Sequence, residues 1–177
     1  KLNFEMNSSY LQNEKEEAVD IGIVFSNQGD TGNDKKEKRP PYTFSSGAIY
    51  DGEWIGKLRD GYGIFIWPDG ARYEGEWKTN KAHGKGKFFH VDSDIFDGQW
   101  VDDKANGYGI YIHKTGARYE GNWKDDRQHG YGIETWPDGS RYEGYFENGK
   151  KEGKGVYYWS DNSKYDGYWS NNMINKF

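Results

Sequence analysis

A five-residue motif recurs six times in this chain at a fixed interval of 23 residues. Each copy begins with an aromatic ring and an acidic residue, has glycine at its third position and ends in another ring. The copies begin at Tyr50, Tyr73, Phe96, Tyr119, Tyr142 and Tyr165, with no insertion or deletion between them. A fixed period of this size is the mark of a repeat architecture. The chain is therefore predicted to stack one supersecondary unit many times.

Each unit is predicted to be a β-hairpin. The two rings and the glycine of the motif lie at i, i+2 and i+4, which puts them on one face of a strand. A pair of glycines two residues apart then leads into an apolar run such as residues 62–67, and a turn such as Pro68-Asp69-Gly70 ends the unit. We therefore expect an all-β fold, an elongated single antiparallel sheet of consecutive 23-residue β-hairpin repeats. Ser93 and Asn162 replace the turn glycine in two units and should adopt its left-handed backbone.

The glycines inside the strands need an explanation, because glycine there costs roughly 0.5–1 kcal/mol relative to alanine. Close approach of another group is a usual reason for a strand glycine. We expect the ring of a neighbouring strand to lie flat over each one.

The repeats do not cover the whole chain. Residues 1–41 are predicted as an N-terminal extension and linker, with a short helix at residues 10–18 and a strand at residues 19–25 as candidate elements. That strand is also a candidate to fold back onto the repeats or into their groove. The basic run Lys35–Arg39 is interpreted as a solvated charge cluster, with an anionic partner as the alternative. Residues 42–177 are predicted as the repeat array, about five full repeats with partial units at both ends.

Composition excludes several classes of function. Eighteen per cent of residues are aromatic although the mean hydropathy is −1.15, which favours a thin structure built on large rings. A net charge of −5 and a pI near 5.4 argue against nucleic acid and against non-specific attraction to anionic lipid. The chain has no cysteine and no apolar run of 18 residues. Catalytic and nucleotide-binding fingerprints are absent, so we expect no enzyme activity and no cofactor.

Two columns of the aligned repeats suggest where a ligand would bind. On the predicted second strands they share a face with the strand glycines, so they should line one side of a curved sheet. Such a stripe either packs only on itself or forms a groove for an extended peptide or a helix. Glu134 interrupts it, and His90 and His113 lie too far apart for joint metal ligation, so no metal site is expected. The candidate groove residues are Phe65, Trp67, Phe88, His90, Tyr111, His113, Trp136, Tyr157 and Trp159.

The opposite face carries a regular charge pattern. The second motif position is always acidic, as in Glu74, and Arg or Lys lies two residues before it in most units, as in Arg72. We interpret this as a solvated face with cross-strand ion pairs. Calcium binding is the weaker alternative, because no Asp-rich ligand loop is present.

The pattern of ring-x-Gly-x-ring, about seven residues, Gly-x-Gly, an apolar strand and Asp-Gly resembles the MORN (membrane occupation and recognition nexus) repeat over about residues 42–177. The resemblance implies an all-β hairpin array used as a binding platform. The family occurs in junctional membrane proteins, radial spoke heads and protist cytoskeletal scaffolds, and as a regulatory segment of some lipid kinases and of a SET-domain methyltransferase. Phe96 and Phe146 depart from the usual rings, and Lys85 and Lys87 flank Gly86.

The sequence leaves three functions open. The first is an intracellular, cytoskeleton- or membrane-associated scaffold that binds a protein partner in the aromatic groove, tethers cytoskeleton or enzyme to a membrane, and pairs with itself through the edge strand at residues 165–169. The second is a phosphoinositide-binding module, which an excess of 21 acidic over 17 basic residues between Tyr50 and Trp169 disfavours. The third is the regulatory segment of a larger enzyme, which a chain that begins at Lys1 leaves open.

Overall fold

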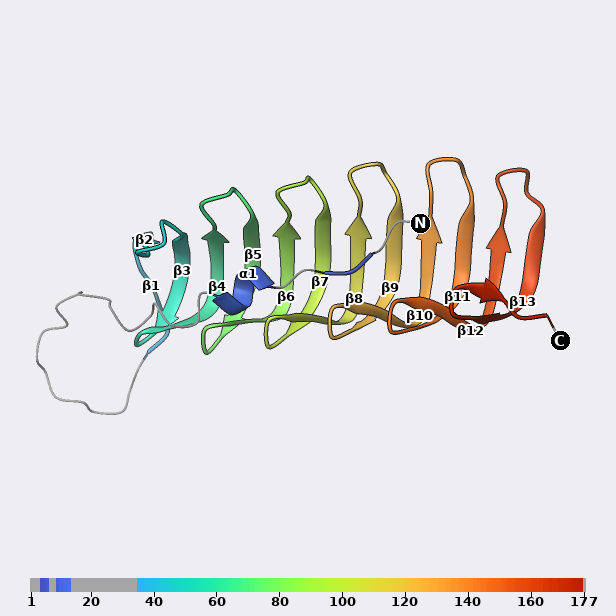
Figure 1. Ribbon diagram of the computed structural model, residues 1–177. Coiled ribbons are helices and arrows are strands. Elements are labelled where there is room, and N and C mark those ends of the chain that lie inside the picture. The colour runs from blue at the N-terminus through green and yellow to red at the C-terminus, as the bar shows by residue number, and fades with distance from the viewer. Residues whose placement is uncertain (1–3, 7–8, 14–34, 177) are drawn as a thin grey trace, which may run out of the picture.

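The computed structural model describes residues 4–6, 9–13 and 35–176, and nearly all of its regular structure is strand (Figure 1). The strands form one open antiparallel sheet of fourteen strands that follow each other in chain order, except that β2 pairs with β3 beside β1. The predicted all-β hairpin array is therefore confirmed. The candidate strand at residues 19–25 lies outside the described residues.

Long and short strands alternate along the sheet. The strand of each unit that carries the motif has seven residues: β3 (Ile49–Ile55), β5 (Arg72–Lys78), β7 (Ile95–Val101), β9 (Arg118–Lys124), β11 (Arg141–Glu147) and β13 (Lys164–Ser170). The strand that follows has nine: β4 (Leu58–Ile66), β6 (Lys81–Phe89), β8 (Lys104–Ile112), β10 (Arg127–Thr135) and β12 (Lys150–Tyr158). The remaining elements are short: α1 (Ser9–Asn13), β1 (Glu37–Lys38), β2 (Tyr42–Thr43) and β14 (Met173–Ile174).

The turns between strands follow from residues that tolerate positive φ. Thr79 and Asn80 join β5 to β6 with φ of 49° and 67°, which is the two-residue turn that matches the twist of a hairpin. At the other end of the strands, Gly70 lies at φ 95°. Ser93 and Asn162 occupy the equivalent position at φ 79° and 67°, so both take the predicted left-handed backbone.

A tyrosine ring, or in one repeat the ring of Phe96, lies against each pair of strand glycines, as predicted. A Cβ atom on Gly63 would lie 2.3 Å from the hydroxyl oxygen of Tyr50, which is on the neighbouring strand β3. The Tyr50 hydroxyl donates a hydrogen bond to the carbonyl oxygen of Glu53, 2.8 Å away, so the ring is held in place. Tyr73 covers Gly86 in the same way one repeat later. Only a residue without a side chain fits beneath these rings.

The second ring of the motif links one hairpin to the next. The Tyr50 ring meets Trp54 of its own hairpin edge-on at 5.0 Å and Trp77 of the following hairpin at 5.6 Å. Trp77 Nε1 also donates a hydrogen bond to the carbonyl oxygen of Gly63, at 3.1 Å. Aromatic contacts of this kind contribute about 0.5–1.5 kcal/mol beyond burial. The repeats are thereby joined through a continuous row of rings.

A bulge lies between the two strands of each of the five full repeats. In the pairing of β3 with β4, Gly52 lies opposite Gly63 and Trp54 lies opposite Arg59. The single residue Glu53 therefore faces three residues of β4. Extra residues of this kind kink a sheet. The lower ends of the hairpins turn forward in Figure 1, which gives the sheet an upright wall and a floor. We call the side of the sheet that carries the buried rings of the motif, such as Tyr73 and Trp77, the trough. Helix α1 lies in front of the wall in Figure 1.

The outer face of the sheet carries ion pairs; the expected cross-strand pairing occurs between Lys38 of β1 and Asp51 of β3, at 3.7 Å, whereas the Arg–Glu pairs of the repeats form along a single strand. Arg72 pairs with Glu74 at 3.2 Å along the same strand, and Arg141 pairs with Glu143 at 2.8 Å. Residues i and i+2 of a strand share a face, so this contact is available locally. The position across from Arg72 is occupied by Phe89, whose ring centre lies 4.3 Å from the guanidinium carbon.

The N-terminal end of the array is closed by a half-unit, as the period predicted. Tyr42 and Thr43 pair with β3, and the Phe44 ring stacks on Phe65 at 5.5 Å. Within the expected linker, β1 also pairs with β3, and Lys36 forms an ion pair with Asp60 at 3.3 Å. None of the helices that the structure describes has the length and apolar character needed to cross a membrane.

We predict that Gly75→Ala destabilises the protein by about 3 kcal/mol or more, because the new Cβ would lie 2.4 Å from the Cα of Gly86 and the two strands would have to separate. Glu74→Ala, one residue away on the outer face, is the matched control and should cost less than about 1 kcal/mol. Urea unfolding followed by tryptophan fluorescence measures both. Equal midpoints for the two variants would refute the role of the glycine.

Candidate functional site

Eight of the nine candidate groove residues form two clusters of rings, and His113 belongs to neither. Phe65, Trp67, Phe88 and Tyr111 are buried, and ring contacts of 4.5–5.9 Å run from Phe65 through His90 to Tyr111. The second cluster is more open. It consists of Trp136, Tyr157 and Trp159, with centroid distances of 6.0 and 5.0 Å, and Trp159 is 41% exposed.

The two histidines of the stripe lie in different environments. Burial lowers the pKa of His90, so at neutral pH this ring packs uncharged between Phe88 and Tyr111. His113 lies at the rim, with Nδ1 2.8 Å from the Thr115 hydroxyl. In the part of the chain that the structure describes, no three His, Cys, Asp or Glu side chains are placed to hold a metal ion.

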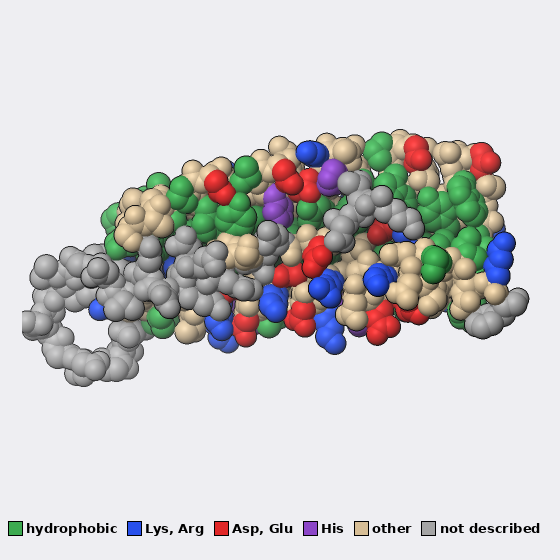
Figure 2. Space-filling model, in the orientation of Figure 1, with side chains coloured by type: hydrophobic (Ala, Val, Ile, Leu, Met, Phe, Trp, Pro, Cys, Tyr) green, Lys and Arg blue, Asp and Glu red, His purple; other side chains and the backbone are tan. Residues whose placement is uncertain are grey.

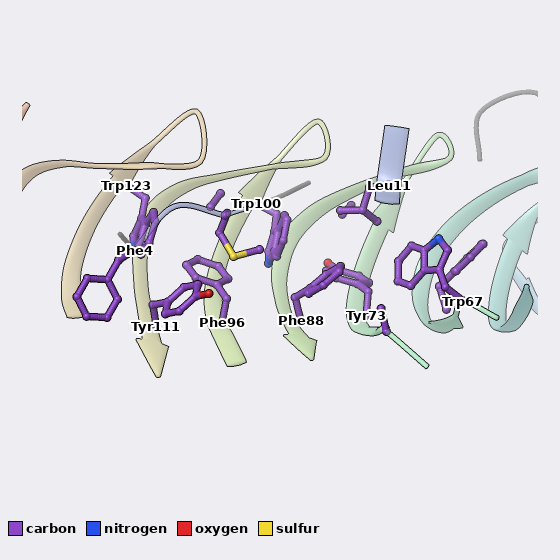
Figure 3. Packing of buried hydrophobic residues seen from close by; sticks show 14 of the residues in the cluster. Phe4, Leu11, Trp67, Tyr73, Phe88, Phe96, Trp100, Tyr111 and Trp123 are labelled. Carbon is purple, nitrogen blue, oxygen red and sulfur yellow. The ribbon is translucent and has the colours of Figure 1, made fainter. Parts of the chain in front are cut away.

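The first cluster is covered by a segment of the N-terminal extension that the sequence did not identify as an occupant of the groove. We call residues 4–6 and 9–11 the N-terminal strap. Phe4, Met6 and Leu11 are 2–3% exposed, and Figure 3 shows Phe4 and Leu11 directed at the rings of the trough. The Phe4 ring lies 5.6 Å from that of Tyr111, edge-on. Within the described residues, α1 covers the start of the expected helix, whose residues 14–18 lie outside them, and the side chains of residues 4, 6, 10 and 11 pack on the rings of the trough.

Polar contacts fix the position of the strap along the trough. The backbone N–H of Met6 donates to the carbonyl oxygen of Asp126 at 3.0 Å. Glu5 pairs with Arg127 at 3.3 Å, and the Tyr10 hydroxyl donates to Asp69 at the rim. The signal in the sequence was the presence of apolar residues at positions 4, 6 and 11 of a polar extension. Three residues make too short a pattern to be distinguished from chance.

Beyond the strap the trough is open. A pocket of about 1060 Å³ begins at Phe4 and continues to the last hairpins, where hydrophobic side chains gather at the C-terminal end of the molecule (Figure 2). Trp136, Tyr157 and Trp159 of the predicted groove line it. The other residues around it include Glu5, Arg127, Gln128, Glu134, Asp138, Lys150, Lys151 and Trp169.

A buried acid–base pair sits beneath this pocket. Glu134 Oε2 lies 3.2 Å from Lys151 Nζ, and both side chains are less than 10% exposed. Gln128 Nε2 donates to the other carboxylate oxygen at 2.8 Å. Glu134 therefore interrupts the aromatic stripe without leaving an unpaired charge, because Lys151 of β12 neutralises it and Gln128 of its own strand β10 donates a hydrogen bond to it.

Gln128 and Lys151 belong to a floor column that sequence reasoning missed. The second residue of each long strand points up into the trough and is buried: Arg59, Ala82, Ala105, Gln128 and Lys151. At the N-terminal end the Arg59 guanidinium lies over the rings of Trp77 and Phe65, at 4.9 and 5.2 Å. In the sequence this column is one variable position, two residues after each hairpin turn. Sequence reasoning missed it because only the bulge of the folded hairpin places this position in the floor of the trough.

The exposed part of the trough therefore combines large apolar rings with a few fixed polar groups. Sites that bind peptides and other organic ligands have this makeup, since the rings supply contact area and the polar groups orient the ligand. The array of hairpins holds these side chains on rigid strands.

Comparison with known proteins agrees with the repeat pattern. The family model described as MORN repeat matches residues 50–72, 73–95, 96–118, 119–141, 142–164 and 165–175, which together are more than half of the chain. A search of curated proteins found no match. Among 33 matching chains of solved structures is the wild-type TCP10 domain of Danio rerio CPAP in complex with a peptide of Danio rerio STIL. It is 11% identical over 77% of this chain and 75% of that chain, with a TM-score of 0.26. A likeness at that score carries no argument about the site.

We predict that Lys151→Ala destabilises the protein by roughly 3–5 kcal/mol, because the Glu134 carboxylate is then left buried without a cation. Adding Glu134→Phe should recover most of this loss, since Phe88 is fully buried at the equivalent position two repeats earlier, where Ala82 and Ala105 stand in place of Gln128 and Lys151. Lys150→Ala, at the exposed neighbouring position, is the control. Thermal and urea unfolding measure the three variants. A double variant no more stable than Lys151→Ala would contradict the pairing.

Proposed function

The chain belongs to the MORN repeat family, and from this premise we propose that it is a non-catalytic scaffold that binds protein partners in its trough. The open pocket beside Phe4 is the observation that carries the proposal. Three of its walls are the rings of Trp136, Tyr157 and Trp159, which are rigid and lose little conformational entropy when covered. An extended peptide or a single helix is the ligand that a channel of this shape accepts.

The finer parts of the proposal concern where the scaffold acts. We propose an intracellular protein associated with cytoskeleton or membrane, which tethers a cytoskeletal component or an enzyme. Self-association is part of this proposal, because β14 pairs only with Trp169 and Ser170, so most of β13 has no outer strand partner in the described part of the chain.

The two alternatives have less support. A phosphoinositide-binding module needs a basic surface, whereas the region from Tyr50 to Trp169 carries 17 basic and 21 acidic residues. Several of the basic side chains are also engaged in ion pairs, among them Arg72, Arg118 and Arg141. A regulatory segment of a larger enzyme, such as a lipid kinase, would use the same trough, so the pocket does not favour it over a free scaffold.

We predict that Trp136→Ala combined with Trp159→Ala abolishes partner capture, because the two indoles form the walls of the open pocket. The measurement is a pull-down from cell extract with quantitative mass spectrometry, comparing the variant with the wild-type chain. Partners that depend on the trough should fall at least about tenfold, as expected for the loss of two interface tryptophans.

Tyr108→Ala combined with Tyr131→Ala is the matched control for that experiment. Both tyrosines are exposed, at 47% and 46%, and lie on the outer face of the sheet. The control should retain the partners of the wild type. Retention of all partners by the tryptophan variant would refute the trough as the binding site.

We also predict little binding to anionic vesicles. Co-sedimentation with vesicles that contain phosphatidylinositol 4,5-bisphosphate should pellet only a small fraction of the protein at physiological salt, because the repeat region is net negative. Strong binding that is lost as salt increases would reverse the order of the first two functions.

A further inference from the structure

We propose that the N-terminal strap occupies the trough as an intramolecular ligand. The partner is then a peptide with the same arrangement of anchor side chains, and it displaces the strap. This rests on the proposed function and specifies its ligand. The partner carries an aromatic residue, an acidic residue and an apolar residue in succession, followed four to five residues later by a tyrosine–leucine pair in a helical turn.

The strap occupies the trough as a bound peptide does. Residues 4–6 and 9–13 form no strand of the sheet and contribute nothing to the ladder that joins the repeats. Phe4, Met6 and Leu11 are nevertheless as buried as the rings of the repeats themselves. The sheet is built without the strap, and the strap is held by side chains inserted among the rings.

The anchors fall at separate points along the trough. Phe4 packs against Tyr111 and Tyr119, at 5.6 and 6.4 Å, while Tyr10 packs against Trp67 and Phe88, at 5.5 and 6.0 Å. The aromatic surface thus accepts two anchor groups about six residues apart, which defines a pattern that a partner can reproduce.

Charge adds direction to this pattern. Glu5 lies between the two buried anchors Phe4 and Met6, and its carboxylate pairs with Arg127 on the floor side of the trough. The Met6 N–H donates to the carbonyl oxygen of Asp126 next to it. A peptide bound in the opposite direction would lose both contacts, so an acidic residue directly after the aromatic anchor sets the polarity of the ligand.

The strap also limits the open pocket. Phe4 and Glu5 form its wall on the side of the first cluster, whereas Trp136 and Trp159 lie on the other side. A partner that enters at Trp136 meets Phe4 directly. Release of the strap would join the two aromatic clusters into one channel from Trp67 to Trp159, which accommodates a longer segment than the pocket alone.

A partner must compete with an intramolecular ligand. The strap is joined covalently to the sheet, so it rebinds without loss of translational freedom, while a partner binds from solution. The wild-type chain is therefore expected to bind short peptides weakly, and loss of the anchors in the strap should raise affinity without any change in the trough.

The test uses the full chain and a fluorescent synthetic peptide with the sequence of residues 1–13. The peptide should bind the Phe4→Asp plus Leu11→Asp chain at least about tenfold more tightly than the wild type in an anisotropy titration. A peptide with alanine in place of Phe4 and Met6 should lose that binding. Far-ultraviolet circular dichroism establishes that the variant is folded, and Phe4→Ala plus Leu11→Ala is the milder variant if it is not.

Equal affinity of the peptide for wild type and strap variant, including absence of binding to both, would overturn the inference. A concentration-dependent dimer of the wild type that the strap variant loses would assign the trough to the strap of a second copy and would also overturn it. Neither result depends on Trp136 and Trp159, whose effect on partner capture tests the proposed function separately.

Discussion

The structure depends on the contact between a tyrosine or phenylalanine ring and a pair of facing glycines. Gly52 and Gly63 pair across β3 and β4 directly beneath the ring of Tyr50, where no side chain fits. This arrangement lets a single sheet bury large rings although, in the described part of the chain, only the short N-terminal strap packs on it. The ring in turn contacts a tryptophan on each side, so the stability of one hairpin depends on its neighbours.

That contact is repeated faithfully, whereas the trough that it builds is not uniform. Toward the N-terminal end the wall is a row of buried rings above small floor residues such as Ala82 and Ala105. Toward the C-terminal end Phe146 replaces the tryptophan that would donate to a glycine carbonyl, and Glu134 and Lys151 replace apolar contacts with a buried ion pair. The open pocket lies where these residues differ from the other repeats. The array therefore has a closed section toward its N-terminal end and, toward its C-terminal end, a section that a ligand can enter.

Much of the fold and part of the site could be predicted from the sequence. Hairpins, turn positions and the face that buries the rings follow from a period of 23 and from alternation along a strand, and both are local properties. The candidate residues at Trp136, Tyr157 and Trp159 do line the open pocket. Trp67, Phe88 and Tyr111 instead contact the rings of the strap, which covers a stripe that would otherwise leave a large apolar surface in water.

The sequence by itself determined the repeat, the ring-over-glycine packing and the all-β architecture, since each is set by residues close together in the chain. Only the tertiary structure decided which segment fills the trough and where it remains open. Contacts such as Phe4 with Tyr111 or Glu5 with Arg127 join residues more than 100 positions apart. No periodicity marks such contacts, because a single short segment inserted among rings is recognised by shape and burial, and these exist only once the sheet has bent into a wall and a floor.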